Sequence, residues 1–457
     1  MSNRILSGVR LRARLGCTVA AVLALTAAPA LAQDVARMEQ VVRSSLDRNE
    51  FTGSVLVARG DQVLLDQGFG LANREWNIPN AGDTKFRLGS VSKQFTAVAI
   101  LQLRERGLID IDAPVKTWLP DAPAGWDAIT PRHLMAHTAG LPNVTSLDSF
   151  RAYKMQETTP EATLALFRDL PLDFQPGQDF AYSNSGYLLL SLIIEKASGQ
   201  SYADYLDQHL FRPLGMADSG YDVSATVLPR RASGYTPAPG GGFANAEYIN
   251  MVVPQGAGAL YSTTRDLLKW EEGLFGGRLL DPESMALLTT PVRSGYAFGL
   301  GVRPSQGGQL LLHSGGIEGF NTFMAHDTGS DMTVIVLGNL NGPAPDKIGA
   351  DLMTLANGGT VTLPEERSEI TVSAEDLRAY EGVYELAPTF SITIAVVDGG
   401  LTAQATGQQA LALSPEAQDA FFLRMVDARI TFTRDASGVV ESLTLHQNGR
   451  EMPGRKR

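Results

Sequence analysis

Residues 87–97 read Arg-Leu-Gly-Ser-Val-Ser-Lys-Gln-Phe-Thr-Ala, and this stretch predicts the start of a buried helix. Gly89 suits a turn, apolar residues are dense after Lys93, and Gly107 is a natural helix end. Ser90 and Lys93 are three residues apart, so both side chains lie on one face of that helix. A serine hydroxyl needs a neighbouring base to become a strong nucleophile, and a desolvated lysine with a lowered pKa can be that base. Free N–H groups at the start of the helix would stabilise negative charge that develops at Ser90.

The spacing of Ser90 and Lys93 has a simpler explanation when it is taken alone. Ser90 would cap an ordinary helix, and Lys93 would be solvated. Lys93 is, however, the only lysine in the chain with a serine three residues before it. The rest of the sequence has to decide between the two explanations.

The first 32 residues have the pattern of a secretion signal. Four arginines precede an apolar run over residues 18–28, and the sequence Ala-Leu-Ala ending at Ala32 is a small-x-small cleavage site. We therefore expect removal of residues 1–32 and a secreted, periplasmic protein. The one cysteine, Cys17, would leave with the signal, so the mature chain would contain neither a disulfide nor a reactive thiol.

The charge of the chain excludes some classes of partner. The formal net charge is −11, and it becomes more negative when the arginines of the signal are removed. A strongly acidic protein is not expected to bind nucleic acid or an anionic membrane surface. No later stretch is apolar enough to cross a bilayer, so we expect no integral membrane anchor. The sequence leaves the oligomeric state open.

The pattern of apolar runs predicts an α+β fold over residues 33–357. A hairpin at residues 53–65 begins an antiparallel sheet, and helices flank it. Residues 109–245 are mostly helical with Pro and Gly punctuation, which predicts an all-helical subdomain. Four later strands would complete the sheet: 298–302, 310–316, 320–325 and 332–337.

The last part of the chain predicts a second, smaller domain. Residues 358–373 read as a linker that is rich in Gly and charged residues. Residues 374–457 contain seven or eight short strand-like runs separated by turn signals, which predicts a small antiparallel β-barrel.

Two histidines four residues apart suggest a metal site as an alternative. Residues 129–137 predict a short helix with Thr130 as its cap, and this helix would put His133 and His137 on one face. No acidic residue completes a metalloprotease pattern, and no third ligand is evident. We therefore expect structural roles for both histidines, and no metal or other cofactor.

A polar loop and a glycine-rich strand supply further candidates. Tyr182 and Asn184 stand just before an apolar helix, where a tyrosine hydroxyl can move a proton and an amide can hold a substrate carbonyl. His313 precedes Ser-Gly-Gly at residues 314–316, and the small residues would leave one strand edge bare for a ligand. Each motif is weak when it is considered separately.

Taken together, three elements resemble one superfamily. They are Ser90-x-x-Lys93, Tyr182-Ser183-Asn184 and His313-Ser314-Gly315, in this order. With their context they resemble the serine β-lactamase and penicillin-binding protein superfamily. The likeness is greatest to the branch of class C β-lactamases, D-alanyl-D-alanine carboxypeptidases, D-aminopeptidases and family VIII esterases. The resemblance implies a β-lactamase-like fold, and the barrel is similar to the lipocalin-type tail of some peptidases of this group.

The resemblance also implies a mechanism. Ser90 would attack an ester or amide carbonyl while Lys93 and Tyr182 share the role of general base, and two nearby cations would favour ionised Tyr182. Tyr182 would also protonate the leaving group. Backbone N–H groups of Ser90 and Gly316 would form the oxyanion hole. The residues implied to hold the substrate are Asn184, His313, Ser314 and Gly315.

Two departures from the superfamily bear on the substrate. Most class C β-lactamases have Lys-Thr-Gly where this chain has His-Ser-Gly at His313, and a neutral histidine holds a carboxylate less well than a lysine does. Simple lactamases also lack the C-terminal domain. We therefore expect a serine hydrolase that acts on a small-molecule or peptide substrate, with ester or peptide bonds favoured over β-lactams.

Three other classes of protein remain as alternatives. A non-catalytic sensor or binding protein with the same fold would not need Ser90. An α/β-hydrolase would require a Gly-x-Ser-x-Gly motif, which the chain lacks. A metallohydrolase would need His133 and His137 to share a metal.

Overall fold

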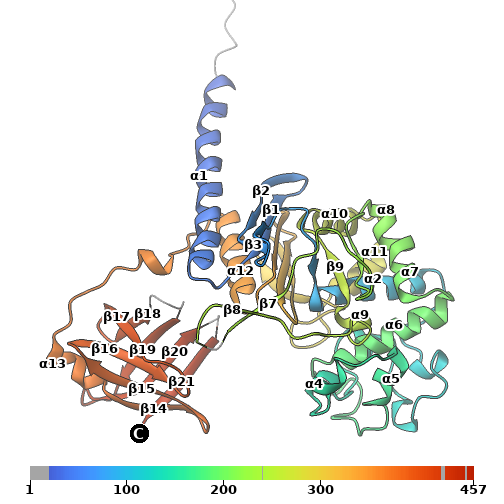
Figure 1. Cartoon of the computed structure of the whole chain (residues 1–457). Helices are drawn as coiled ribbons and strands as arrows, with labels where there is room; N and C mark the ends of the chain where they lie inside the picture. The colour runs from blue at the N-terminus through green and yellow to red at the C-terminus, as the bar shows by residue number, and fades with distance from the viewer. Residues whose placement is uncertain (1–19, 239, 424–427, 448–449) are drawn as a thin grey trace, which may run out of the picture.

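The computed structural model describes residues 20–457 except 239, 424–427 and 448–449. Its centre is a six-stranded antiparallel sheet in the order β10-β11-β12-β13-β1-β2. The strands are β1 (Gly53–Arg59), β2 (Gln62–Phe69), β10 (Gly301–Ser305), β11 (Gly308–Ile317), β12 (Phe320–Asp327) and β13 (Met332–Gly338). Figure 1 shows this sheet between a helical region on one side and the C-terminal barrel on the other.

Helices cover both faces of the sheet, which explains why the strands β1 and β13 are almost continuously buried. All seven residues of β13 are buried. Alternate residues of β1 enter different cores: Leu56 packs on the face that carries α2 (Ser92–Glu105) and α10 (Thr264–Phe275), and Val57 packs on the face that carries α1 (Ala20–Asp47) and α12 (Ala344–Ala356).

The helical region lies beyond α2 and provides one wall of the candidate site. Its elements are η2 (Val115–Thr117), η3 (Ala124–Trp126), α3 (Pro131–Met135), η4 (Val144–Ser146), α4 (Phe150–Tyr153), α5 (Pro160–Ala165), α6 (Asn184–Ser198), α7 (Tyr202–Leu206), η5 (Asp207–Phe211) and α8 (Arg212–Leu214). The remaining elements before α12 are β3 (Leu71–Asn73), β4 (Ile78–Pro79), β5 (Phe86–Arg87), η1 (Gly89–Val91), β6 (Gly220–Tyr221), β7 (Tyr235–Pro237), β8 (Phe243–Asn245), α9 (Gln255–Gly258), β9 (Leu260–Ser262) and α11 (Pro282–Thr289).

The C-terminal strands close into a barrel of eight antiparallel strands, β14 to β21. After η6 (Pro364–Glu366), α13 (Ala374–Leu377) and η7 (Arg378–Tyr380), they are β14 (Gly382–Ala387), β15 (Phe390–Val397), β16 (Gly400–Ala405), β17 (Leu411–Ala417), β18 (Ala420–Leu423), β19 (Ala428–Arg434), β20 (Val440–Gln447) and β21 (Arg450–Lys456). The α+β class and the barrel are thereby confirmed.

Several details differ from the sequence prediction. The helix that begins at Pro131 ends at Met135, and His137 has a positive φ of 56°, so His133 and His137 do not share a helix face. The strand expected from residue 298 begins at Gly301. The eighth barrel strand, β21, contains Pro453 and Gly454, which weaken its strand pattern in the sequence.

The predicted secretion signal is only partly described. Its residues 1–19 lie outside the described residues, and residues 20–32 form the first part of the α1 backbone helix. Within the described part of the chain, no helix combines the length and apolar character needed to cross a bilayer.

Candidate active site

The turn that carries Ser90 depends on close backbone packing. Ser90 lies in η1, directly before α2. Gly89 has φ of +53°, and a Cβ atom there would come within 2.8 Å of the Gly316 nitrogen. Only glycine adopts this conformation readily and leaves room for β11. The backbone at Gly316 is therefore held next to Ser90.

Lys93 is the buried neighbour of Ser90. Its Nζ lies 3.0 Å from Ser90 Oγ, 2.8 Å from Asn184 Oδ1 and 2.9 Å from the Ala257 carbonyl oxygen. The residue is completely buried, and this desolvation places the pKa of Lys93 well below the usual lysine value.

The neutral form of Lys93 fits these three contacts well. A neutral amine has two hydrogens and one lone pair. The amide oxygen of Asn184 and the carbonyl oxygen of Ala257 can only accept hydrogen bonds, so they take both hydrogens. The lone pair then faces the Ser90 hydroxyl, which is the one partner that can donate.

Tyr182 stands two residues before α6 and brings its hydroxyl to Ser90, with which it hydrogen-bonds. Its ring centre lies 4.8 Å from Lys93 Nζ. Although 37% of the residue is exposed, protein atoms surround the hydroxyl end, and this desolvation raises the pKa of Tyr182 against the opposing effect of the Ser90 hydrogen bond. The expectation that cations favour ionised Tyr182 is therefore wrong: the phenol is protonated because burial disfavours its anion.

Asn184 is the first residue of α6, and its amide is fixed at both ends. The oxygen accepts from Lys93, while Nδ2 donates to Asn143 Oδ1 at 3.3 Å and to Thr145 Oγ1 at 3.1 Å. The Asn184 backbone N–H also donates to Asn143 Oδ1. These contacts dock the loop before η4 onto the start of α6.

His313 is neutral and turned inward. Its Nδ1–H donates to the Ser314 carbonyl oxygen at 2.6 Å, and its Nε2 accepts from the Tyr296 hydroxyl at 2.9 Å. Burial first, and then the proximity of Lys93, lower the pKa of His313 to about 3, against the effect of the Ser314 contact. His313 therefore carries no charge with which to hold a carboxylate at neutral pH.

The small residues after His313 form a bare strand edge, as the sequence predicts. β10 pairs with residues 308–312 of β11 and leaves residues 313–317 unpaired on that side. A Cβ atom at Gly315 would lie 2.0 Å from the Leu88 carbonyl oxygen, so this edge can pass beside η1 only with glycine. The Ser314 hydroxyl, in contrast to the prediction for it, donates to Asp346 of α12.

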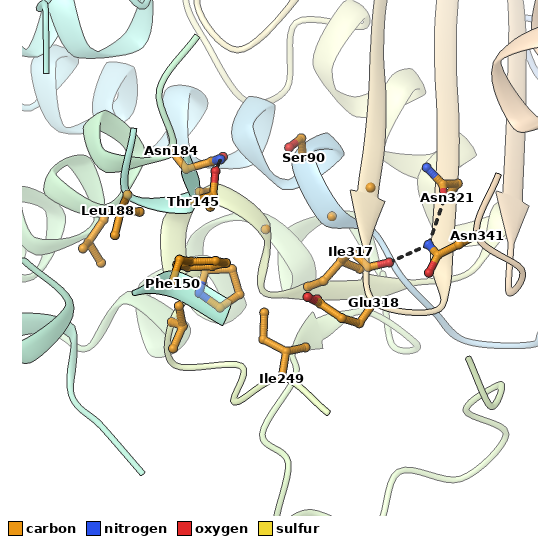
Figure 2. A pocket seen from close by; sticks show the side chains of 17 residues that line it. Ser90, Thr145, Phe150, Asn184, Leu188, Ile249, Ile317, Glu318, Asn321 and Asn341 are labelled. Atoms are coloured by element: carbon orange, nitrogen blue, oxygen red, sulfur yellow. Dashed lines mark hydrogen bonds between the residues drawn. The ribbon is translucent and has the colours of Figure 1, made fainter. Parts of the chain in front are cut away.

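A cavity of about 430 Å³ opens beside Ser90. Ser90, Asn184 and Gly316 contribute to its lining, and Figure 2 shows Phe150, Ile249 and Ile317 on the side away from the Ser90 helix. None of the lining residues in the described part of the chain is lysine, arginine or histidine. Its one acidic lining residue, Glu318, accepts a hydrogen bond from Lys154 at 2.5 Å.

Sequence reasoning missed the role of His137 in supporting Tyr182. The His137 ring packs 4.3 Å from the Tyr182 ring, and its Nδ1 accepts the Ser183 backbone N–H at 3.2 Å. Only 2% of His137 is exposed, and burial, with Lys93 and His313 nearby, holds its pKa well below 6.5. The signal that was available is the run Thr-Ala-Gly after His137, which indicates that the helix has already ended.

The remaining residues missed by the sequence are backbone and polar partners. Asn143 and Thr145 orient Asn184, and Ala257 contributes only its carbonyl oxygen. No motif distinguishes such contacts. His133 caps its own helix through Thr130, and among the described residues no three His, Cys, Asp or Glu side chains are grouped to hold a metal.

Comparison with known proteins places this arrangement in a family. Residues 38–357 match the family model described as Beta-lactamase, and residues 366–456 match a domain of unknown function (DUF3471). The chain is 29% identical over 431 residues to penicillin-binding protein 4* of Bacillus subtilis, and this alignment covers 89% of this chain and 95% of the relative. It is also 29% identical over 302 residues to a D-aminopeptidase of Gluconobacter oxydans, covering 63% of this chain and 55% of that protein.

A solved structure extends the likeness to nearly the whole chain. The octameric penicillin-binding protein homologue from Pyrococcus abyssi aligns with a TM-score of 0.66 and 25% identity, over 92% of this chain and 100% of that one. The family model alone spans well over half of the sequence. This chain belongs to the beta-lactamase family, a family of serine hydrolases that includes penicillin-binding proteins and D-aminopeptidases.

Proposed function

We propose that this protein hydrolyses an amide or ester bond through a covalent acyl intermediate on Ser90. The observation that carries the proposal is the buried Lys93, whose Nζ lies 3.0 Å from Ser90 Oγ while two obligate acceptors take its hydrogens. A lysine held neutral next to a serine is suited to remove the proton of that serine.

In the acylation step, Ser90 Oγ attacks the substrate carbonyl carbon and its proton passes to Lys93 Nζ. The negative charge that develops on the carbonyl oxygen is stabilised by the backbone N–H groups of Ser90 and Gly316. The protonated phenol of Tyr182 donates its proton to the leaving nitrogen or oxygen as the scissile bond breaks. The state of Tyr182 supports this acid role, since burial raises its pKa.

Deacylation restores the starting protonation states. Water attacks the acyl ester and gives one proton to the Tyr182 phenolate. The departing Ser90 oxygen takes the proton back from the Lys93 ammonium. The protons balance over the two steps, and no metal or other cofactor enters the scheme.

The cavity supports a substrate without a carboxylate close to the scissile bond. Its described lining contains no basic side chain, His313 is neutral, and Lys154 is engaged by Glu318 and Glu247. Apolar groups such as Phe150 and Ile249 would contact an apolar side chain of the substrate. We therefore favour D-aminoacyl amides, peptides with a free amino end, or esters over penicillins and peptides with a free carboxyl end.

The organisation of the chain belongs to the same proposal. Residues 1–32 would be removed during secretion, 33–357 would form the hydrolase domain, 358–373 the linker and 374–457 the barrel domain. The buried side chains described in α1 begin at Met38, so the proposed cleavage after Ala32 would leave that packing unchanged.

The test compares the mature protein with Ser90→Ala on four substrates: a D-alanyl anilide, a short acyl nitrophenyl ester, a penicillin and a D-alanyl-D-alanine peptide. We expect turnover of the first two, a Ser90-dependent acyl adduct in the intact mass, and little turnover of the last two. Equal activity of Ser90→Ala would overturn the mechanism. A permanent adduct without turnover on any substrate would instead indicate a sensor.

A further inference from the structure

A second cavity, of about 270 Å³, lies at the other end of the central sheet. Asn321 lines the cavity beside Ser90 and His326 lines the second one, and the two residues are five steps, or about 17 Å, apart along β12. Its walls come from α10, from β12 and β13, and from the turns at residues 59–62 and 327–332. The two turns are joined by a hydrogen bond from the Gly60 N–H to the Asp331 carbonyl oxygen.

The second cavity is acidic. Asp61, Glu272 and Asp331 form an exposed rim, and Glu271 lies at the buried end with His326. None of the described lining residues is lysine or arginine. Glu271 is only 5% exposed, so its carboxyl group has lost most of its contact with water.

Glu271 also has an unsatisfied oxygen. Its Oε2 is buried and forms no hydrogen bond, and His326 Nδ1, at 4.0 Å, is too far away for one. His326 is itself occupied, because Nδ1 contacts Thr333 Oγ1 at 3.0 Å and the ring stacks on Phe275 at 4.1 Å. A buried acceptor without a partner is rare in folded proteins and calls for an explanation.

We propose that this second cavity binds a small organic cation, with a primary ammonium or guanidinium group that donates to Glu271 and is surrounded by the carboxyl groups of the rim. Such a group has several N–H donors and a positive charge, which are the two things this cavity lacks. The volume far exceeds the roughly 30 Å³ share of one water molecule. A bare metal ion fits less well, because no three potential ligands among the described residues are grouped to hold one.

Binding at this site is coupled to proton release. Burial raises the pKa of Glu271 to about 8, so its carboxyl group is protonated at pH 7 when no cation is bound. The pKa of His326 is lowered by burial, against the opposing influence of Asp331 and Asp327, so the imidazole is neutral. A bound cation favours the carboxylate of Glu271, and its proton leaves to solvent. The affinity therefore increases as the pH rises toward 8.

The test is calorimetric titration of the mature protein with agmatine and with putrescine, at pH 6 and pH 8 and in buffers of different ionisation enthalpy. We expect one site, tighter binding at pH 8, and a heat that depends on the buffer because a proton is released. Glu271→Gln keeps the shape of the side chain and should weaken binding by about tenfold or more. Asp331→Asn, at the rim, should weaken it several-fold.

Controls separate this site from the first one and from other ligands. Glu272→Gln removes an exposed carboxylate of the same rim and should have the smallest effect. Ser90→Ala should bind the amines as the wild type does, and Glu271→Gln should retain Ser90-dependent hydrolysis, which also shows that it folds. No binding up to tens of millimolar amine, or equal binding by Glu271→Gln, overturns the proposal. Glu271-dependent binding of Mg²⁺ or Ca²⁺ without amine binding would overturn it in favour of a metal site.

Discussion

Each of the two cavities at the ends of β12 lies close to a buried titratable side chain: Lys93, which contacts Ser90 at the first cavity without lining it, and Glu271, which lines the second. The two side chains differ in their hydrogen-bond partners. Lys93 has three oxygen partners within 3.0 Å, whereas Oε2 of Glu271 has none. Burial shifts the pKa of both groups toward the neutral form, down for the amine and up for the carboxylic acid.

The difference teaches how a pKa shift should be interpreted. At Lys93, desolvation keeps the amine neutral, and the two acceptors that bind its hydrogens fix the direction of its lone pair. The amine is therefore a base that is aimed at Ser90. At Glu271 no hydrogen bond to Oε2 compensates for desolvation. The buried carboxyl group therefore either lowers the stability of the fold or serves to bind a ligand. Perturbed pKa values mark both regions as unusual, but only the hydrogen-bond partners distinguish a site prepared for proton transfer from a site prepared for binding.

The largest expected effect is that of Lys93→Met. The substitution keeps the volume and removes the base, so kcat/KM for a D-alanyl anilide should fall by about 1,000-fold or more. In the wild type, kcat/KM should rise with pH through the lowered pKa of Lys93 and reach its plateau well below the ordinary lysine range. The measurement is a pH–rate profile, with circular dichroism to check folding.

Lys269→Met is the matched control for that variant, since it removes a partly exposed α10 lysine whose Nζ donates to the carboxylate of Asp266. It should leave the rate unchanged. If Lys93→Met retained near wild-type rates, Lys93 would not be the base, and the first cavity could no longer be distinguished from the second as a site of proton transfer.

A smaller effect is expected from Tyr182→Phe, and its size should depend on the leaving group. An anilide leaving group needs a proton, so its hydrolysis should slow by about 100-fold or more. A nitrophenolate leaves without protonation, so the ester should slow by roughly tenfold or less. Parallel kinetics on the two substrates measure this. Equal losses on both would assign Tyr182 the role of base.

Per pH unit, the smallest effect is that of Glu271 on the dependence of stability on pH. The folded-state pKa of Glu271, about 8, lies above its ordinary value of 4.5, so between these pH values the folded state holds one proton more than the unfolded state. Wild-type stability should therefore decline relative to Glu271→Gln by at most about 1.4 kcal/mol per pH unit across that window.

Urea unfolding at pH 4, 6 and 8 measures this difference, with Glu272→Gln as the exposed control. Parallel pH curves for wild type and Glu271→Gln would mean that Glu271 is satisfied in solution, and the contrast between the two cavities would disappear.

Much of the fold could be predicted from the sequence because local patterns of apolar and turn-forming residues determine it. The hairpin after residue 53, the helix after Ser90 and most barrel strands follow from apolar periodicity and turn residues. The Thr-Ala-Gly run after His137 indicates only that the helix ends nearby. The left-handed backbone at His137 itself could not be predicted, because it depends on tertiary contacts rather than on propensity.

The sequence predicted which residues form the candidate site better than it predicted their protonation states and side-chain orientations. The three sequence elements do converge around Ser90, as spacing and resemblance suggested. The protonated Tyr182, the neutral His313 and the turned-away Ser314 hydroxyl follow from burial and from partners distant in the chain, such as Tyr296 and Asp346. The loss of water around a side chain depends on such distant partners, so it cannot be predicted from local sequence patterns.

The attachment of the barrel has a consequence for weak interactions. Glu366 accepts a hydrogen bond from Arg37 of α1 at 2.5 Å, and the next residue, Arg367, lies 5.7 Å from the Phe422 ring of the barrel. Ile370 then donates to the Pro415 carbonyl oxygen of β17. From residue 366 to residue 370 the chain reaches at most about 14 Å. So short a tether holds the barrel near the hydrolase domain at an effective concentration in the millimolar range. A contact between the two domains with a dissociation constant below that concentration would be formed most of the time, although it would be too weak to join two separate proteins at ordinary concentrations.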